Sequence, residues 1–402
     1  MTEITLTGIV AQHSLRAAVA EVMAVEDVTE GVPTAVSAIL HRKLPQASSP
    51  TAPTVPLPGE AGFVPTGRGD AIRFRGQLTA PSDQAYERLA KRFGALGYTP
   101  LLRKDDDRLR DVVLAVPGTL RKANQRLGIA ALLFGLTLVS CLFAGAQMVE
   151  GLTAVNWNLL DGLPYAVSLL AILGAHELGH YLTARRLGSP TSLPYFIPMP
   201  FGFGTLGAVI NMVAPPRNRR HLLAIAVAGP LAGLAVAIPV LLIGLKLSQI
   251  EPLPVAGPYQ MEGNSLLYFA LKFIVFGRLL PANGVDVFIH PVAFAGWVGL
   301  LVTGLNLIPA GQLDGGHIVY ALFGEQIANI FLWAVLAVLV ALLFFWPGWA
   351  IWVVLIFFLG RLRAEPLDDL TQLTSRQRVL AMSMILIFFL VFTPIPMRVI
   401  KG

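Results

Sequence analysis

The residues best suited to chemistry in this chain are His176, Glu177 and His180, which lie inside an apolar stretch from about Leu163 to Leu182. Positions four apart share one face of a helix, so the two imidazoles can offer nitrogens to a single metal ion. Glu177 stands beside them as a candidate proton carrier. Ionisable residues are costly in membrane-spanning helices and are usually functional there, so the pattern predicts a metal site within the bilayer.

A third ligand is expected from another segment at the same depth. Basic residues flank the apolar runs and define a cytoplasmic side, which puts His176 and His180 in the cytoplasmic half of their helix. A later apolar run crosses in the opposite direction and ends near Asp314, at a similar level. Two neutral imidazoles, a carboxylate and a water molecule form the open arrangement of catalytic zinc, so we expect one Zn²⁺ per chain.

The composition indicates a membrane protein. Of 402 residues, 55% are hydrophobic and 13% are charged, against roughly a quarter charged in soluble proteins, and the mean hydropathy is +0.66. The net charge of +6 could suggest nucleic-acid binding, but Lys and Arg gather beside the apolar runs, as in cytoplasmic loops, so we expect no nucleic-acid partner. The single cysteine, Cys141, excludes an intrachain disulfide and a Cys-rich zinc module.

The predicted fold is mainly α and polytopic, with about seven transmembrane helices and a re-entrant hairpin, plus a small α+β soluble domain at the N-terminus. Hydrophobic runs of spanning length lie at about 127–147, 163–185, 222–245, 286–309, 326–346, 347–360 and 379–395. A further apolar stretch, 264–280, contains Lys272 and Arg278 and is expected on the surface or only partly inserted.

The chain divides into four parts by composition. The sequence does not decide the structure of residues 1–43, and it predicts a Pro-rich linker at 44–69. It predicts a small β-α-β-β cytoplasmic domain at 70–117. The transmembrane domain is expected at 120–402, with a catalytic core at 163–325. The start of the chain lacks the features of a secretory signal, so insertion through internal helices is expected. We expect a multi-pass protein of the cell membrane with its N-terminal domain in the cytoplasm.

The motif His176-Glu-Leu-Gly-His180, followed by Asn306-x-x-Pro309-x-x-x-Leu-Asp314-Gly, resembles the site-2 protease family of intramembrane metalloproteases. The resemblance implies that the two histidines and Asp314 bind zinc, that Glu177 is the catalytic acid/base, and that Asn306 stabilises the tetrahedral intermediate. It also implies hydrolysis of peptide bonds within transmembrane segments of other proteins, in regulated intramembrane proteolysis. Pro309 would break the helix, so that Asp314 can turn inward.

A soluble domain before the first span, with no PDZ-length insertion, is similar to the plant and cyanobacterial-type branch of that family. The branch carries Gly-Asn-Leu-Arg before its membrane part, whereas this chain has Arg73-Phe-Arg-Gly76 at the comparable place. The role of that motif therefore does not transfer to this chain.

The segment 194–211 is rich in proline and glycine and cannot form a continuous helix. We interpret it as a re-entrant hairpin beside the zinc, in which Gly204, Thr205 and Gly207 bind a substrate helix unwound into an extended strand. A purely structural loop is the alternative.

Other interpretations remain open for the chain and for several residues. A catalytically silent zinc-binding chaperone or scaffold is the main rival function, a zinc transporter is another, and residues 70–117 alone could be a regulatory binding module. His317 is favoured as a hydrogen-bonded helix residue over a fourth ligand, His290 is expected too far from the zinc, and His221 belongs to a basic interface cluster. Gly229-Pro230 and Gly233 are interpreted as helix-packing residues. The oligomeric state and the substrate stay open.

Overall fold

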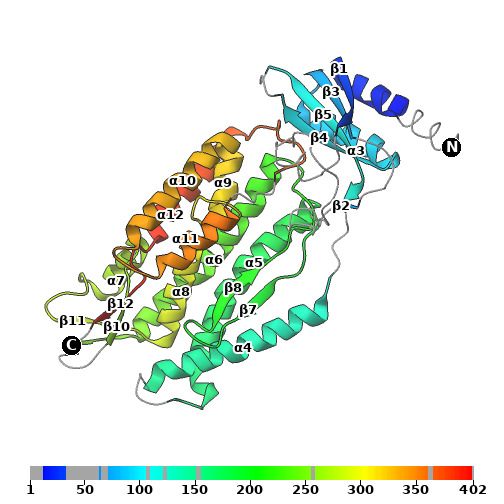
Figure 1. Cartoon of the computed structure of the whole chain (residues 1–402). Coiled ribbons are helices and arrows are strands. Elements are labelled where there is room, and N and C mark those ends of the chain that lie inside the picture. Colours follow the sequence, from blue (N-terminus) through cyan, green and yellow to red (C-terminus); the bar gives the residue numbers. More distant parts are fainter. Residues whose placement is uncertain are drawn as a thin grey trace.

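The computed structural model covers the whole chain and describes residues 12–32, 63–64, 71–105, 109–120, 125–150, 155–254, 259–360 and 365–400. A small α+β domain sits at one end of a bundle of helices, and β12 (Met397–Ile400) lies at the opposite end (Figure 1). This arrangement confirms a mainly helical protein with a small α+β domain. The predicted linker 44–69 lies outside the described residues except for β2 (Phe63–Val64), which pairs with β6 (Thr119–Leu120).

The N-terminal domain contains an antiparallel sheet in the order β1-β3-β5-β4, and its helix α3 (Ser82–Ala95) packs against β4. Its strands are β1 (Met23–Val32), β3 (Ala71–Leu78), β4 (Tyr98–Lys104) and β5 (Asp111–Pro117). The last three strands and α3 follow the predicted β-α-β-β order.

The predicted start of this domain at residue 70 is too late. β1 pairs with β3, and residues 12–20 form a helix whose Leu15 and Val19 are buried with Phe74 and Leu89. The sequence did not indicate this strand, because its apolar residues are mixed with Glu and Asp. The strand is stabilised by its backbone pairing with β3, which the local pattern of residues does not indicate.

In the part of the chain that the structure describes, four helices are long and apolar enough to cross a membrane: α4 (Leu127–Glu150), α5 (Leu163–Arg186), α6 (Arg219–Leu247) and α10 (Glu325–Leu342). The other predicted spans form shorter helices, namely α8 (Pro291–Asn306), α11 (Trp349–Leu359) and α12 (Ser375–Val391). The stretch 264–280 contains α7 (Leu266–Phe276). The count of seven spans therefore stays a prediction.

Helices α5, α6 and α8 form the centre of the bundle, together with α9 (Asp314–Phe323). Small residues let them approach closely. A Cβ at Gly179 of α5 would lie 2.5 Å from the carbonyl oxygen of Ala228 in α6, and a Cβ at Gly296 of α8 would lie 2.7 Å from Leu241 Cα. Such close helix packing gives the side chains between these helices fixed positions.

The segment after α5 forms a β-hairpin of β7 (Tyr195–Pro198) and β8 (Thr205–Val209), which lies between α4 and α5 (Figure 1). Two other small sheets pair β9 (Gln249–Pro252) with β11 (Val285–Phe288), and β10 (Tyr259–Glu262) with β12.

Candidate active site and metal centre

Three predicted ligands meet inside the helix bundle. The Nε2 atoms of His176 and His180 are 3.1 Å apart, and Asp314 Oδ2 lies 3.3 Å from the first and 3.2 Å from the second. Both histidines are buried, and Asp314 is nearly so. Within the described residues, this is the group of histidine and carboxylate side chains that could hold a metal ion. The structure thus brings together residues separated by more than a hundred positions in the chain.

The backbone between α8 and α9 brings Asp314 to the histidines. Helix α8 ends at Asn306, and a short turn leads to α9, whose first residue is Asp314. The turn is so tight that a Cβ at Gly315 would lie 2.0 Å from the carbonyl oxygen of Leu307, and one at Gly316 would lie 2.4 Å from that of Gly311. Pro309 lies in this turn, where it cannot continue the helix.

The hydrogen bonding of His180 determines which of its nitrogens is free. Its Nδ1 lies 2.7 Å from the carbonyl oxygen of Ile225 in α6, and a carbonyl only accepts, so Nδ1 carries the hydrogen. In the neutral ring Nε2 then presents a lone pair to the other two donor atoms. Ligating histidines commonly use their second nitrogen in this way.

The spacing of the three atoms suits zinc. Ligands held tetrahedrally at zinc bond lengths lie roughly 3.3 Å from one another, and the distances between His176 Nε2, His180 Nε2 and Asp314 Oδ2 are 3.1 to 3.3 Å. Lone pairs this close in an apolar interior repel one another unless a cation or protons lie between them. The donor set therefore fits a divalent metal.

Two glycines of α6 form the surface against which the imidazoles pack. A Cβ at Gly229 would lie 2.0 Å from His180 Nε2, and one at Gly233 would lie 3.1 Å from His176 Nδ1. The sequence interpretation assigned both only to helix packing. Their spacing of four residues, which repeats that of the two histidines, was the available signal.

Glu177 and Asn306 lie close to the same centre. Glu177 follows His176 directly in α5 and is buried. Asn306 is the last residue of α8, and its Nδ2 lies 3.3 Å from His176 Nε2. The histidine pair is thus flanked by a carboxylate in its own helix and by an amide from α8.

The predicted substrate residues Gly204, Thr205 and Gly207 lie at the start of β8. The Thr205 hydroxyl donates to the carbonyl oxygen of Ile197 at 2.8 Å and accepts from the Gly207 amide at 3.0 Å. Gly204 has φ +81°, and a Cβ there would lie 2.7 Å from Cys141 Cα. Both residues therefore have structural contacts within the hairpin and with α4. Gly207, with φ +101°, faces open space.

Side chains of α4 and α5 anchor the hairpin. Ser140 donates to the carbonyl oxygen of Met199 at 2.6 Å, and Tyr165 donates to that of Phe203 at 2.8 Å. No strand among the described residues pairs with the outer edge of β8, where Leu206 is exposed.

His221, His290 and His317 lie outside the donor triangle. His290 caps the start of α8, where its Nδ1 accepts from the Val292 amide at 3.2 Å. It is a full helix of 16 residues away from Asn306, which corresponds to about 24 Å. His317 is buried one turn after Asp314, and His221 lies in the first turn of α6.

Comparison with known protein families gives a match that includes this centre. Residues 164–346 match the family described as Peptidase family M50. This segment belongs to family M50, the site-2 proteases. The M50 segment includes His176, His180 and Asp314, and the match confirms the resemblance inferred from the motifs.

The chain is also similar to several plant proteins. The chain is 34% identical over 271 residues to a protein of Oryza sativa subsp. indica named probable zinc metalloprotease EGY2, chloroplastic, covering 64% of this chain and 49% of that protein. It is 32% identical over 279 residues to the Arabidopsis thaliana protein of the same name, covering 67% and 50%. It is 29% identical over 297 residues to probable zinc metalloprotease EGY3, chloroplastic, of Oryza sativa subsp. indica, covering 67% and 50%.

The chain spans about half the length of these curated relatives. No solved structure matches it.

Proposed function

We propose that this chain is a zinc-dependent endopeptidase that cuts a transmembrane segment of another protein within the bilayer. The observation that carries the proposal is the triangle of His176 Nε2, His180 Nε2 and Asp314 Oδ2 between apolar helices, with edges of 3.1 to 3.3 Å. Membership of the M50 segment in a peptidase family, and relatives named as probable zinc metalloproteases, support it independently.

In this proposal His176, His180 and Asp314 hold the zinc ion. A zinc ion with an open position polarises a peptide carbonyl and lowers the pKa of a bound water toward about 7. The hydrogen bond from His180 Nδ1 to Ile225 keeps that ring oriented, and Gly229 and Gly233 leave room for both imidazoles. The apolar helices around the centre limit the access of bulk water.

Glu177 is the proposed acid/base. Its carboxylate takes a proton from the attacking water and delivers it to the nitrogen of the departing amine, so the net reaction is addition of water across the peptide bond. Asn306 is the proposed donor to the carbonyl oxygen of the cleaved bond, since its amide N–H groups can stabilise the negative charge that develops there. Its position 3.3 Å from His176 puts it at the edge of the centre.

The proposed substrate surface is the outer edge of β8, at Thr205 to Val209. A peptide bond inside an intact helix is shielded, so a substrate must be extended near the centre, and an unpaired strand edge can bind such a segment through backbone hydrogen bonds. Gly204 and Thr205 would hold the shape of the edge, and Gly207 would leave space for the substrate backbone.

The proposed topology is that of a multi-pass membrane protein with the N-terminal domain and the active site near the cytoplasmic side. Arg217, Arg219 and Arg220 lie at the end of α6 that contacts this domain, and basic residues are enriched on the cytoplasmic side. The substrates would then be membrane proteins cut in regulated proteolysis.

The test is cleavage of a reporter transmembrane helix by purified protein reconstituted in vesicles, together with measurement of bound zinc. We expect Glu177→Gln to keep zinc and lose cleavage by a factor of about 10² or more. The matched control is Gly174→Ala, in the same helix, because a Cβ there meets nothing within 4 Å. Unchanged cleavage by Glu177→Gln would exclude the acid/base role. A wild-type protein that binds zinc and leaves every reporter intact would favour the silent scaffold.

A further inference from the structure

The sheet of the N-terminal domain continues into the membrane domain. On its free side, β4 exchanges hydrogen bonds with the segment that precedes α12: Leu102 N donates to the carbonyl oxygen of Leu367 at 2.9 Å, and Asp369 N donates to that of Leu102 at 3.0 Å. The same segment bonds on its other side to the residues that lead into α6, because Asp368 N donates to the carbonyl oxygen of Arg217 at 2.8 Å. Residues 367–369 are therefore held between the domain and the start of α6.

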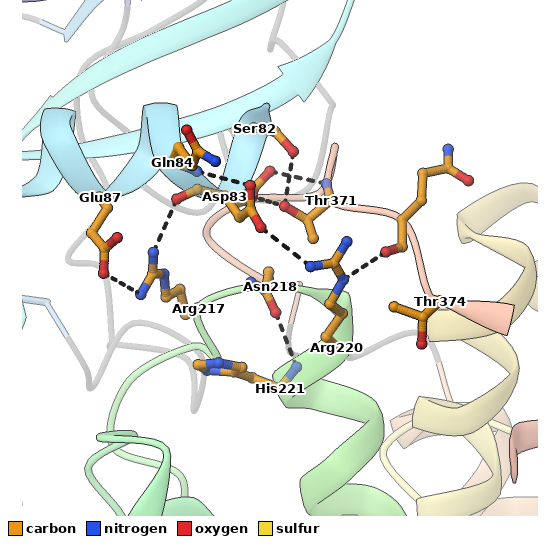
Figure 2. A network of polar contacts seen from close by, with 12 residues as sticks. Ser82, Asp83, Gln84, Glu87, Arg217, Asn218, Arg220, His221, Thr371 and Thr374 are labelled. Carbon is orange, nitrogen blue, oxygen red and sulfur yellow. Dashed lines mark hydrogen bonds and ion pairs between the residues drawn. The ribbon is translucent and has the colours of Figure 1, made fainter. Parts of the chain in front are cut away.

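Side chains reinforce this contact (Figure 2). Arg217 of the membrane domain lies 3.2 Å from the Glu87 carboxylate and donates to the carbonyl oxygen of Asp83 in α3 at 3.0 Å. Arg220 lies 3.2 Å from the Asp83 carboxylate, and Ser82 is hydrogen-bonded to Thr371 at 2.8 Å. The domain thus contacts both the 365–374 segment and the first turn of α6.

Asp369 is the point where these contacts meet the helices of the metal centre. Its two carboxylate oxygens accept from Arg219 Nε at 2.8 Å and from Arg219 Nη2 at 2.9 Å, and Oδ1 also accepts from the Tyr320 hydroxyl at 3.1 Å. The Arg219 guanidinium lies over the Tyr320 ring, 5.7 Å from its centroid. Asp369 is half-buried and Tyr320 is buried, so this bidentate pair is better shielded from solvent than a surface ion pair.

Both partners of Asp369 belong to helices that shape the metal centre. Arg219 begins α6, six residues before Ile225, whose carbonyl accepts from His180. Tyr320 lies in α9, six residues after Asp314. Six helical residues correspond to about 9 Å. The carboxylate therefore joins α6 and α9 at points about 1.7 turns from Ile225 and Asp314. A shift of one helix along the other would break a hydrogen bond to this carboxylate.

We infer that Asp369 is a positioning residue for the metal centre, and that docking of the N-terminal domain holds it in place. The inference rests on the proposed zinc peptidase function. Asp369 does not touch the reacting atoms. It holds the helix that carries Asp314 in register with the helix that orients His180, and it is itself held by the backbone of β4 through Leu102. A domain that shifts or undocks would release this register and lower the catalytic rate.

The test compares Asp369→Asn and Tyr320→Phe with Glu87→Gln in the full-length protein. Glu87→Gln is the matched control, because Glu87 is mostly exposed and its substitution leaves the backbone hydrogen bonds of Leu102 to Leu367 and Asp369 in place. Bound zinc is measured by competition with a chelator, the visible absorption spectrum of Co²⁺-loaded protein reports ligand geometry, and kcat and KM are measured separately on the reporter helix.

We expect Asp369→Asn and Tyr320→Phe to raise the zinc dissociation constant by about 2-fold to 30-fold, the range for residues coupled to a site without touching it. The Co²⁺ spectrum should change, kcat should fall and KM should stay within about twofold. Glu87→Gln should match the wild type in all four readouts. Tyr320→Phe removes a single oxygen atom, so it still tests the role of Asp369 if Asp369→Asn does not fold.

Wild-type zinc affinity, Co²⁺ spectrum and kcat in both variants would overturn the inference while leaving the proposed function intact. A wild-type protein that binds no zinc, or a His176→Ala variant that retains it, would instead overturn the proposed function. The two failures are therefore distinguishable.

Discussion

Gly229→Ala offers a sharp test of the metal centre, because it adds one methyl group in a known direction. The ideal Cβ would lie 2.0 Å from His180 Nε2, 2.4 Å from Cδ2 and 2.4 Å from Cε1. Non-bonded heavy atoms make contact at about 3.5 Å. The imidazole must therefore move by about 1.5 Å, whereas ligand distances in metal sites hold to within about 0.2 Å.

The collision is with the end of a side chain, so the protein can relieve it by rotating His180 away from the site. We expect Gly229→Ala to fold but to lose His180 as a ligand, which should raise the zinc dissociation constant more than about 100-fold. Loss of a residue that only hydrogen-bonds to a ligand usually has a smaller effect. Alanine favours a helix over glycine by about 1 kcal/mol, so α6 itself should not be weakened.

Two further glycines calibrate this experiment. Gly233→Ala brings a Cβ to 3.1 Å from His176 Nδ1, which needs a shift of only a few tenths of an ångström, and Gly174→Ala meets nothing within 4 Å. We therefore expect the wild type and Gly174→Ala to bind zinc equally tightly, Gly233→Ala to bind it more weakly, and Gly229→Ala to bind it most weakly. Chelator competition measures the affinity, and thermal unfolding checks the fold. Equal zinc affinity in Gly229→Ala and wild type would refute the placement of His180 against α6.

Three other outcomes follow from the metal centre and the hairpin. Asp314→Ala should reduce bound zinc, measured by atomic absorption, to well below one ion per chain, whereas Glu177→Gln should keep it. Full zinc occupancy in Asp314→Ala would remove Asp314 from the ligand set. Treatment of the wild type with a chelator should abolish reporter cleavage, and added Zn²⁺ should restore it; cleavage that persists without metal would contradict the proposed chemistry. Ser140→Ala, which removes a hydrogen bond of 2.6 Å to Met199 in the hairpin, should raise KM for the reporter more than it lowers kcat, and an unchanged KM would argue against the hairpin as the substrate surface.

The sequence alone indicated the membrane character of the chain and the three side chains that meet at the centre. Positions four apart on a helix must share a face, so His176 and His180 could be paired without coordinates. Asp314 could be added because the predicted direction of an apolar run sets the depth at which that run should end. The hydrophobic runs likewise indicated the helices, since length and apolarity are local properties of the chain.

Only the tertiary structure decided which other residues serve that centre. Gly229 and Gly233 contact the imidazoles because α6 packs against α5 at the level of the two histidines. The hydrogen bonds of Asp369 to Arg219 and Tyr320 join three segments that are far apart in the chain. The edge strand β1 was not predicted either, because its apolar residues are mixed with Glu and Asp and the strand is identified only by its pairing with β3. Each of these features depends on which surfaces meet in the folded protein, and no local pattern of residues records that.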